Sequence, residues 1–78
     1  MKTVEIYSTP VCKYCSLAKD FFKKNNIAYT EHDVASNQAK KEEMIEKSGQ
    51  LGVPVIDVGG DIVIGFDEAV LKDLLAIK

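Results

Sequence analysis

Residues 12–15 of the chain read Cys12-Lys13-Tyr14-Cys15, and they hold both cysteines of the 78-residue sequence. They lie where an alternating strand pattern gives way to a helical pattern. Residues three apart in a first helical turn approach closely enough for a disulfide. The exposed N–H groups and the positive dipole end of that turn favour thiolate over thiol at the first cysteine. The spacing fits thiol–disulfide exchange, although taken alone it also fits half of a zinc site.

Size and composition indicate an ordinary folded protein. Hydrophobic residues make up 46% of the sequence and charged residues 28%, which is typical of a soluble globular domain. The length predicts one domain over residues 1–78. A disulfide that closes so short a loop constrains the unfolded chain only weakly, so we do not expect the cysteines to serve stability.

The net charge is −2, from 10 basic and 12 acidic residues, and it gives no indication of nucleic-acid binding. The N-terminal Met1-Lys2-Thr3 leads straight into a strand pattern without a signal-peptide run, and the apolar runs are too short to cross a bilayer. We therefore expect a cytoplasmic protein that does not enter a membrane. In a reducing cytosol an exposed cysteine pair is expected to be catalytic or metal-binding.

Hydrophobic periodicity predicts the element order βαβαββα. Strands are expected at 2–8, 27–34, 53–58 and 61–64, and helices at 13–24, at 36–48 and after Asp67. The first two strands should be parallel with a right-handed crossover, and Gly59-Gly60 should join the last two as an antiparallel hairpin. The expected fold class is α/β, with a four-stranded mixed sheet flanked by three helices.

Caps and buried faces follow from residue type and spacing. Ser36 is expected to cap the second helix, Gly49 to end it and Asp67 to cap the last helix. The Lys and Glu residues of 36–48 predict a solvated face. The first helix is expected to bury Tyr14, Leu17, Ala18, Phe21 and Phe22, and the last helix Val70, Leu71, Leu74, Leu75 and Ile77.

Taken together, three motifs resemble those of a glutaredoxin, and the resemblance covers the length of the chain. They are Cys12-Lys13-Tyr14-Cys15, Val53-Pro54 before the third strand, and Gly65-Phe66-Asp67 before the last helix. The chain is most similar to the short bacterial glutaredoxin-like group, which also resembles the redoxins that serve ribonucleotide reductase. The resemblance implies a thioredoxin-like fold and a glutathione-dependent reductase of protein disulfides and glutathione mixed disulfides. In this reading Cys12 is the nucleophile and Cys15 the resolving thiol.

The resemblance also implies how a thiol substrate is held. Val53-Pro54 is expected to be cis and to lie beside the cysteines, with the Val53 backbone free to pair with an extended substrate. The alternative is that Pro54 only begins an edge strand. Gly65 and Asp67 would hold the γ-glutamyl end of glutathione, with Asp67 also acting as a helix cap. Tyr14 would either pack beside the bound sulfur or be a partly buried helix aromatic.

The sequence departs from the family pattern around these motifs. Thr9 stands where many glutaredoxins have a lysine, and Lys13 stands where proline is common. Ile64-Gly65 replaces a double glycine, and Phe66 replaces a small residue. Lys13 would therefore either contact the glycyl carboxylate of glutathione or indicate a different electron donor. The alternative function is a redoxin that thioredoxin reductase feeds and that supplies electrons to ribonucleotide reductase.

The chain has few side chains that could bind a metal ion. A zinc site needs four ligands, whereas the chain offers two cysteines and His32, which we expect to be a surface or satisfied residue. No metal and no tightly bound cofactor are expected, with glutathione as co-substrate and disulfide-containing or glutathionylated proteins as partners. Further alternatives are a [2Fe–2S] cluster bridged by Cys12 of two protomers and a redox-silent interaction domain. With no excess apolar stripe, a monomer is expected.

Overall fold

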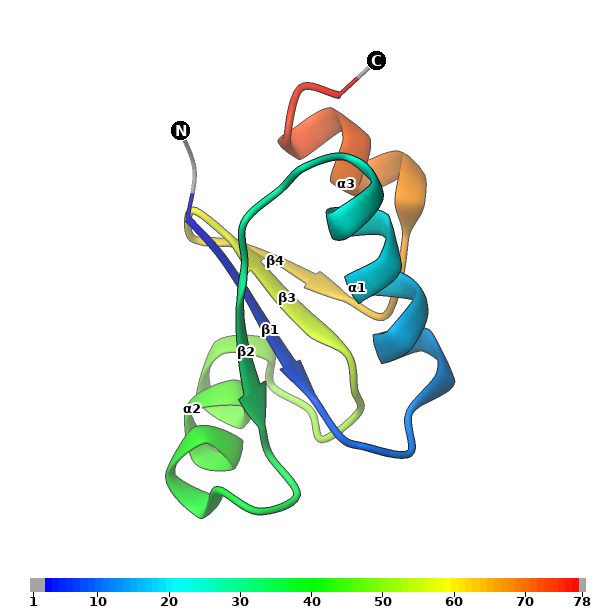
Figure 1. Ribbon diagram of the computed structural model, residues 1–78. Coiled ribbons are helices and arrows are strands. Elements are labelled where there is room, and N and C mark those ends of the chain that lie inside the picture. Colours follow the sequence, from blue (N-terminus) through cyan, green and yellow to red (C-terminus); the bar gives the residue numbers. More distant parts are fainter. Residues whose placement is uncertain (1–2, 78) are drawn as a thin grey trace.

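The computed structural model describes residues 3–77 as a four-stranded sheet with the order β2-β1-β3-β4 and three helices (Figure 1). The strands are β1 (Val4–Ser8), β2 (Thr30–Asp33), β3 (Val55–Val58) and β4 (Asp61–Ile64), and the helices are α1 (Lys13–Lys24), α2 (Gln38–Ser48) and α3 (Glu68–Leu74). β1 pairs in parallel with β2 and antiparallel with β3, which pairs antiparallel with β4. The predicted element order and mixed sheet are confirmed.

Two strand starts differ from the prediction, and the second strand also ends at Asp33 and not at residue 34. The second strand begins at Thr30 and not at residue 27, because Asn26 has a φ of 57° and the N–H of Ile27 still bonds to the Phe22 carbonyl at 2.8 Å. The third begins at Val55 and not at residue 53. The predicted start of the first strand at residue 2 lies outside the described residues.

The cap of α2 is also one residue later than predicted. Asn37, and not Ser36, accepts a hydrogen bond from the N–H of Lys40 at 3.1 Å. The helix is delayed because Asp33 first organises a turn: its carboxylate accepts from the Ala35 N–H at 2.9 Å, and its carbonyl accepts from Asn37 at 3.1 Å. The predicted caps at the other positions are confirmed, since Gly49 ends α2 with a φ of 73° and Asp67 caps α3.

The helices cover both faces of the sheet (Figure 1). On one face α1 and α3 pack on alternate residues of β1 and β3, with a buried core made of Val4, Ile6, Ala18, Phe21, Phe22, Ile56, Val58, Val63 and Leu71. On the other face α2 packs on the remaining residues, with a smaller buried core made of Tyr7, Val34, Met44 and Val55. The two-residue period of the strands thus separates the two cores.

The buried face of α1 differs from the predicted one. Cys15, Ala18 and Phe22 point to the sheet together with Phe21, whereas Tyr14 is 60% exposed and Leu17 is 40% exposed. The prediction that Tyr14 and Leu17 are buried is therefore wrong, because the inward stripe begins one position later. Val70 of α3 is also exposed, contrary to the prediction, while Leu71 is fully buried.

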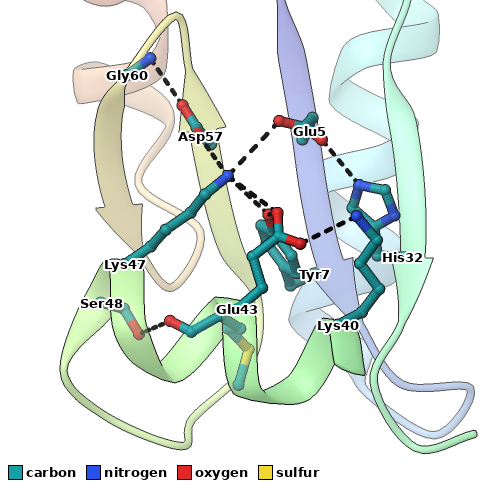
Figure 2. A network of polar contacts seen from close by, with 10 residues as sticks. Glu5, Tyr7, His32, Lys40, Glu43, Lys47, Ser48, Asp57 and Gly60 are labelled. Atoms are coloured by element: carbon teal, nitrogen blue, oxygen red, sulfur yellow. Dashed lines mark hydrogen bonds and ion pairs between the residues drawn. The ribbon is translucent and has the colours of Figure 1, made fainter. Parts of the chain in front are cut away.

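The charged residues of α2 partly turn toward the sheet, so they are more than the solvated face that the sequence predicts (Figure 2). The ammonium of Lys47 donates hydrogen bonds to the Tyr7 hydroxyl and the Asp57 carboxylate, both at 2.8 Å. It also lies 3.3 Å from Glu43 and 3.6 Å from Glu5. The Tyr7 hydroxyl donates to Glu43 at 2.6 Å. These residues form what we call the Lys47 network.

His32 extends this network at the parallel edge of the sheet. Its Nε2 lies 2.9 Å from a Glu5 oxygen, and its ring centroid lies 5.0 Å from that of Tyr7 (Figure 2). This histidine has polar and aromatic partners on neighbouring strands, so the prediction of a satisfied residue is confirmed. Among residues 3–77, none of the helices combines the length and apolar composition that crossing a bilayer requires.

Candidate active site

Cys12 caps the N-terminal end of α1. β1 ends at Ser8, the chain turns through residues 9–11, and the N–H of Cys12 donates to the Thr9 carbonyl at 3.3 Å. The backbone of Cys12 is extended (φ −89°, ψ 114°), and its sulfur accepts a hydrogen bond from the Cys15 N–H at 3.2 Å. The sulfur therefore takes the position of an N-cap side chain at the positive end of the helix dipole.

Cys15 occupies the opposite kind of environment. Both cysteines are free thiols, but Cys15 is only 1% exposed whereas Cys12 is partly exposed. Burial, followed by the hydrogen bond to Cys12, raises the pKa of the Cys15 thiol to about 12. The predicted difference in exposure is confirmed. The arrangement suits an outer sulfur that meets the substrate and an inner sulfur that stays protonated until it is used.

The segment Val53-Pro54 lies directly beside Cys12, and its peptide bond is cis, as the resemblance implies. The Cys12 thiol donates to the Val53 carbonyl oxygen at 3.8 Å, across 41 residues of sequence. The sequence predicts that this carbonyl is free for a substrate. In the structure it instead accepts a hydrogen bond from the nucleophile, Cys12. The alternative of an edge strand after Pro54 is wrong, because β3 lies between β1 and β4.

A groove of about 590 Å³ lies along this segment. It is lined by Tyr14, Val53, Pro54, Ile64, Gly65, Phe66, Asp67, Glu68 and Ala69. Every binding residue that the sequence predicts, with the exception of Lys13, therefore lines one groove. Lys13 is exposed at the first position of α1, outside the lining. A larger hollow of about 680 Å³ lies between residues 25–30 and 74–77 and contains none of the predicted site residues.

The walls of the groove explain one departure from the family pattern and one residue that keeps to it. Phe66 replaces a small residue, and its ring packs edge-on against Phe21 with centroids 5.8 Å apart, so it is anchored in the core of the α1 face. Gly65 has a φ of 82°, and a Cβ there would meet no atom within 4 Å. Its conformation rather than lack of space therefore requires glycine. The exposed Ile64 stands next to it.

Two carboxylates lie at the α3 end of the groove. Asp67 accepts a hydrogen bond from the Val70 N–H at 3.3 Å through one oxygen, and Glu68 is the next residue. Sequence reasoning missed Ile64, Glu68 and Ala69 as lining residues. Their only signal is adjacency to Gly65-Phe66-Asp67. In the described part of the chain, no group of three or more His, Cys, Asp or Glu side chains is arranged to hold a metal ion.

Known proteins share this sequence pattern and fold. The family model described as glutaredoxin matches residues 4–63, a range that includes the cysteine pair and Val53-Pro54. An uncharacterized glutaredoxin-like 8.6 kDa protein in the rubredoxin operon of Clostridium pasteurianum is 40% identical over 72 residues, covering 92% of this chain and 96% of that protein.

Two further comparisons are with proteins that carry the name glutaredoxin. Glutaredoxin 3 of Escherichia coli strain K12 is 36% identical over 73 residues, covering 94% of this chain and 88% of the relative. The crystal structure of a glutaredoxin from Archaeoglobus fulgidus matches with a TM-score of 0.86 at 25% identity, covering 96% of this chain and 87% of that chain.

Proposed function

The chain belongs to the glutaredoxin family of the thioredoxin superfamily, and on this premise we propose that it reduces disulfides with electrons from glutathione. Membership of the family makes it a thiol–disulfide oxidoreductase. One observation carries the finer proposal. The Cys12 sulfur lies between the Cys15 N–H at 3.2 Å and the Val53 carbonyl at 3.8 Å, beside a groove with carboxylates at its α3 end.

In the dithiol route, the Cys12 thiolate attacks one sulfur of a substrate disulfide and the other sulfur leaves as a thiolate. Cys15 then attacks the Cys12 sulfur of the mixed disulfide, and the second substrate thiol leaves. The substrate has gained two electrons, and the cysteine pair is oxidised to a disulfide. Two glutathione molecules restore the dithiol and leave as glutathione disulfide.

In the monothiol route, Cys12 alone is needed. Its thiolate attacks the glutathione sulfur of a glutathionylated protein, and the protein thiol leaves. The first glutathione is now bound to Cys12 as a mixed disulfide. A second glutathione attacks the sulfur of the first, which releases the Cys12 thiolate and forms glutathione disulfide. The exposure of Cys12 and the burial of Cys15 support this division of tasks.

The groove offers complementary groups to the ends of glutathione. Asp67 has a second carboxylate oxygen that can pair with the γ-glutamyl ammonium while the first caps α3. The Val53 carbonyl can exchange its bond to the Cys12 thiol for one to the substrate backbone once Cys12 has reacted. Tyr14 stands exposed at the rim, beside the position of the bound sulfur. Lys13, exposed at the first position of α1, supplies a cation for the glycyl carboxylate from outside the lining.

The decisive experiment compares two electron donors with one disulfide substrate. We expect turnover with glutathione and glutathione reductase, and little turnover with thioredoxin reductase. Cys12→Ser should abolish both routes, whereas Cys15→Ser should keep glutathione-dependent activity on a glutathionylated substrate. Equal loss in the two variants would show that the monothiol route does not operate.

A second candidate is favoured by Ile64, whose side chain is 55% exposed on the groove wall where the family has glycine. Together with the position of Lys13 outside the groove, it favours a redoxin fed by thioredoxin reductase that donates electrons to ribonucleotide reductase. Turnover with thioredoxin reductase but not with glutathione would establish this candidate and refute the first.

A further inference from the structure

A chain of three polar side chains runs from the end of β1 to the helix of the cysteines. Lys19 follows Cys15 by one helical turn on α1, so the two side chains are neighbours on the helix surface. The ammonium of Lys19 lies 2.8 Å from Oε2 of Glu31 on β2. The hydroxyl of Ser8, which is 1% exposed, donates to the same oxygen at 2.8 Å. The Ser8 hydroxyl thus holds the Glu31 carboxylate, and this carboxylate holds the Lys19 ammonium.

The same strand end also reaches the buried thiol. Thr9, which follows Ser8, makes a backbone hydrogen bond to Cys15, and both this bond and the charge of Lys19 act to lower the pKa of the Cys15 thiol. They act against burial and the hydrogen bond to Cys12, which dominate. The hydrogen bond with Glu31 raises the pKa of Lys19, so its ammonium stays charged. A charged ammonium is therefore held on α1 one helical turn from a thiol that must ionise.

We propose that Lys19 is a positioning residue for the resolving step, in which its ammonium stabilises the Cys15 thiolate while Glu31 and Ser8 hold that ammonium in place. The inference rests on the dithiol route of the proposed function and adds a residue to it. Lys19 acts through Cys15 and does not touch the substrate.

The resolving step exchanges the mixed disulfide for a disulfide between the two cysteines. Cys15 loses its proton to solvent, and its sulfur attacks the Cys12 sulfur of the mixed disulfide. The bond between Cys12 and the substrate sulfur breaks, and the departing thiolate takes up a proton. The substrate half is reduced, and the cysteine pair is oxidised to a disulfide. Lys19 neither gives nor takes a proton, and it lowers the energy of the negative charge on Cys15.

Other charged and titratable groups around this site do not cancel the effect. Glu31 is compensated by Lys19 and by the Ser8 hydroxyl, which together lower its pKa. Asp33 on β2 raises the pKa of Glu31 slightly, but its carboxylate accepts the Ala35 N–H at 2.9 Å in the turn after β2. The charge interaction with Tyr29, before β2, is a minor cause that also acts to raise the pKa of Lys19. Cys12, on the helix of Cys15, acts in the opposite direction to Lys19.

The test measures the resolving step alone, with glutathione disulfide as the probe. Reduced protein is mixed with the probe and quenched with acid, and mass spectrometry follows the glutathionylated and intramolecular disulfide forms over time. The variants are Lys19→Met and Lys19→Arg. Lys40→Met is the matched control, because Lys40 forms a similar ion pair with Glu43 at 3.0 Å on α2.

The expected effect follows from thiolate fraction and nucleophilicity. A neighbouring cation that lowers a thiol pKa by about one unit raises the thiolate fraction about tenfold. The thiolate also becomes about threefold less nucleophilic, which leaves a net gain of about threefold. We therefore expect Lys19→Met to resolve up to about threefold more slowly at neutral pH, with its pH profile displaced to higher pH. Lys19→Arg and Lys40→Met should resolve like the wild type.

A second comparison separates this effect from damage to the fold. In a Cys15→Ser background, which lacks the resolving thiol, Lys19→Met should leave monothiol turnover unchanged. An equal slowing in that background would overturn the inference, because Lys19 would then act on Cys12 or on the fold. A wild-type rate and pH profile for Lys19→Met with both cysteines present would overturn it as well.

The failure of the dithiol route gives a different result. If the wild type never forms the Cys12–Cys15 disulfide and only accumulates the glutathionylated form, the dithiol part of the proposed function is wrong, and the inference falls with it. If the wild type forms the disulfide and Lys19→Met forms it equally fast, only the inference is wrong. Thermal melts of each variant confirm that the compared proteins are folded.

Discussion

Lys47→Met removes one ammonium from the centre of the Lys47 network and keeps a side chain of similar length. The ammonium donates to Tyr7 and Asp57 at 2.8 Å and lies within 3.6 Å of Glu5 (Figure 2). The variant therefore leaves Asp57 and Glu5 near each other without the cation that they share. The hydrophobic contacts of the methylene stem are largely retained, so the loss reports on the polar contacts.

The magnitude follows from the two short bonds. A hydrogen bond that involves a charged group contributes about 1.5–3 kcal/mol, and breaking a fully buried pair costs about 3–5 kcal/mol. The side chain of Lys47 is 28% exposed and that of Asp57 is 11% exposed, so solvent screening favours the lower values. We expect a loss of about 3 kcal/mol in the free energy of unfolding, or about 15 °C in Tm.

The assay is urea unfolding at neutral pH, followed by circular dichroism. Lys40→Met is the control, because Lys40 and Glu43 form a pair at 3.0 Å whose side chains are 33% and 36% exposed. Removal of such a surface pair is expected to cost less than about 0.5 kcal/mol. If Lys47→Met costs no more than Lys40→Met, the reasoning that the ammonium of Lys47 stabilises the sheet against α2 is refuted.

The difference between wild type and Lys47→Met should depend on pH. Burial acts to raise the pKa of Asp57, but hydrogen bonds from Lys47 and the Gly60 N–H bring it below its ordinary value. Hydrogen bonds from Tyr7 and then Lys40 lower the pKa of Glu43 to about 2. A carboxylate with a lowered folded pKa stabilises the fold above its unfolded pKa and loses this contribution as the pH falls through the folded value. Lys47 is the main group that lowers the pKa of Asp57 but only a minor one for Glu43, so the difference should be full at neutral pH and shrink as the pH falls below about 4 through the lowered pKa of Asp57.

Two further predictions concern the candidate site. In the native reduced protein, iodoacetamide should modify Cys12 and spare Cys15, because only Cys12 is accessible; equal labelling by mass spectrometry would contradict the assigned order. Asp67→Asn should keep the helix cap but raise the KM for glutathione about fivefold, since it loses the charge of one charge-assisted bond. Asp67→Ala should also cost about 1 kcal/mol of stability. An unchanged KM in Asp67→Asn would rule out Asp67 as a glutathione contact.

Sequence periodicity predicted the element order but not the phase of every element. Apolar residues at helical spacing indicate that α1 is amphipathic, yet the stripe through Tyr14 and Leu17 and the stripe through Cys15 and Ala18 have the same period. The contact with the sheet selects the second. This orientation of α1 buries the resolving thiol of Cys15 and leaves Tyr14 at the rim of the groove. The late start of α2 has a similar cause, because the Asp33 turn takes precedence over the cap that Ser36 offers.

Some features of the candidate site follow from the sequence, and others depend on the tertiary structure. The sequence by itself determined the cysteine pair at a helix start, the hairpin and the Asp67 cap, because spacing, turn chemistry and capping are local properties of the chain. Only the tertiary structure decided that the Val53 carbonyl meets the Cys12 sulfur, that Lys13 stays outside the groove, and that Ser8 and Lys19 meet at Glu31. These contacts join residues far apart in sequence, and the order and register of the strands set them. No local preference of the chain carries that information.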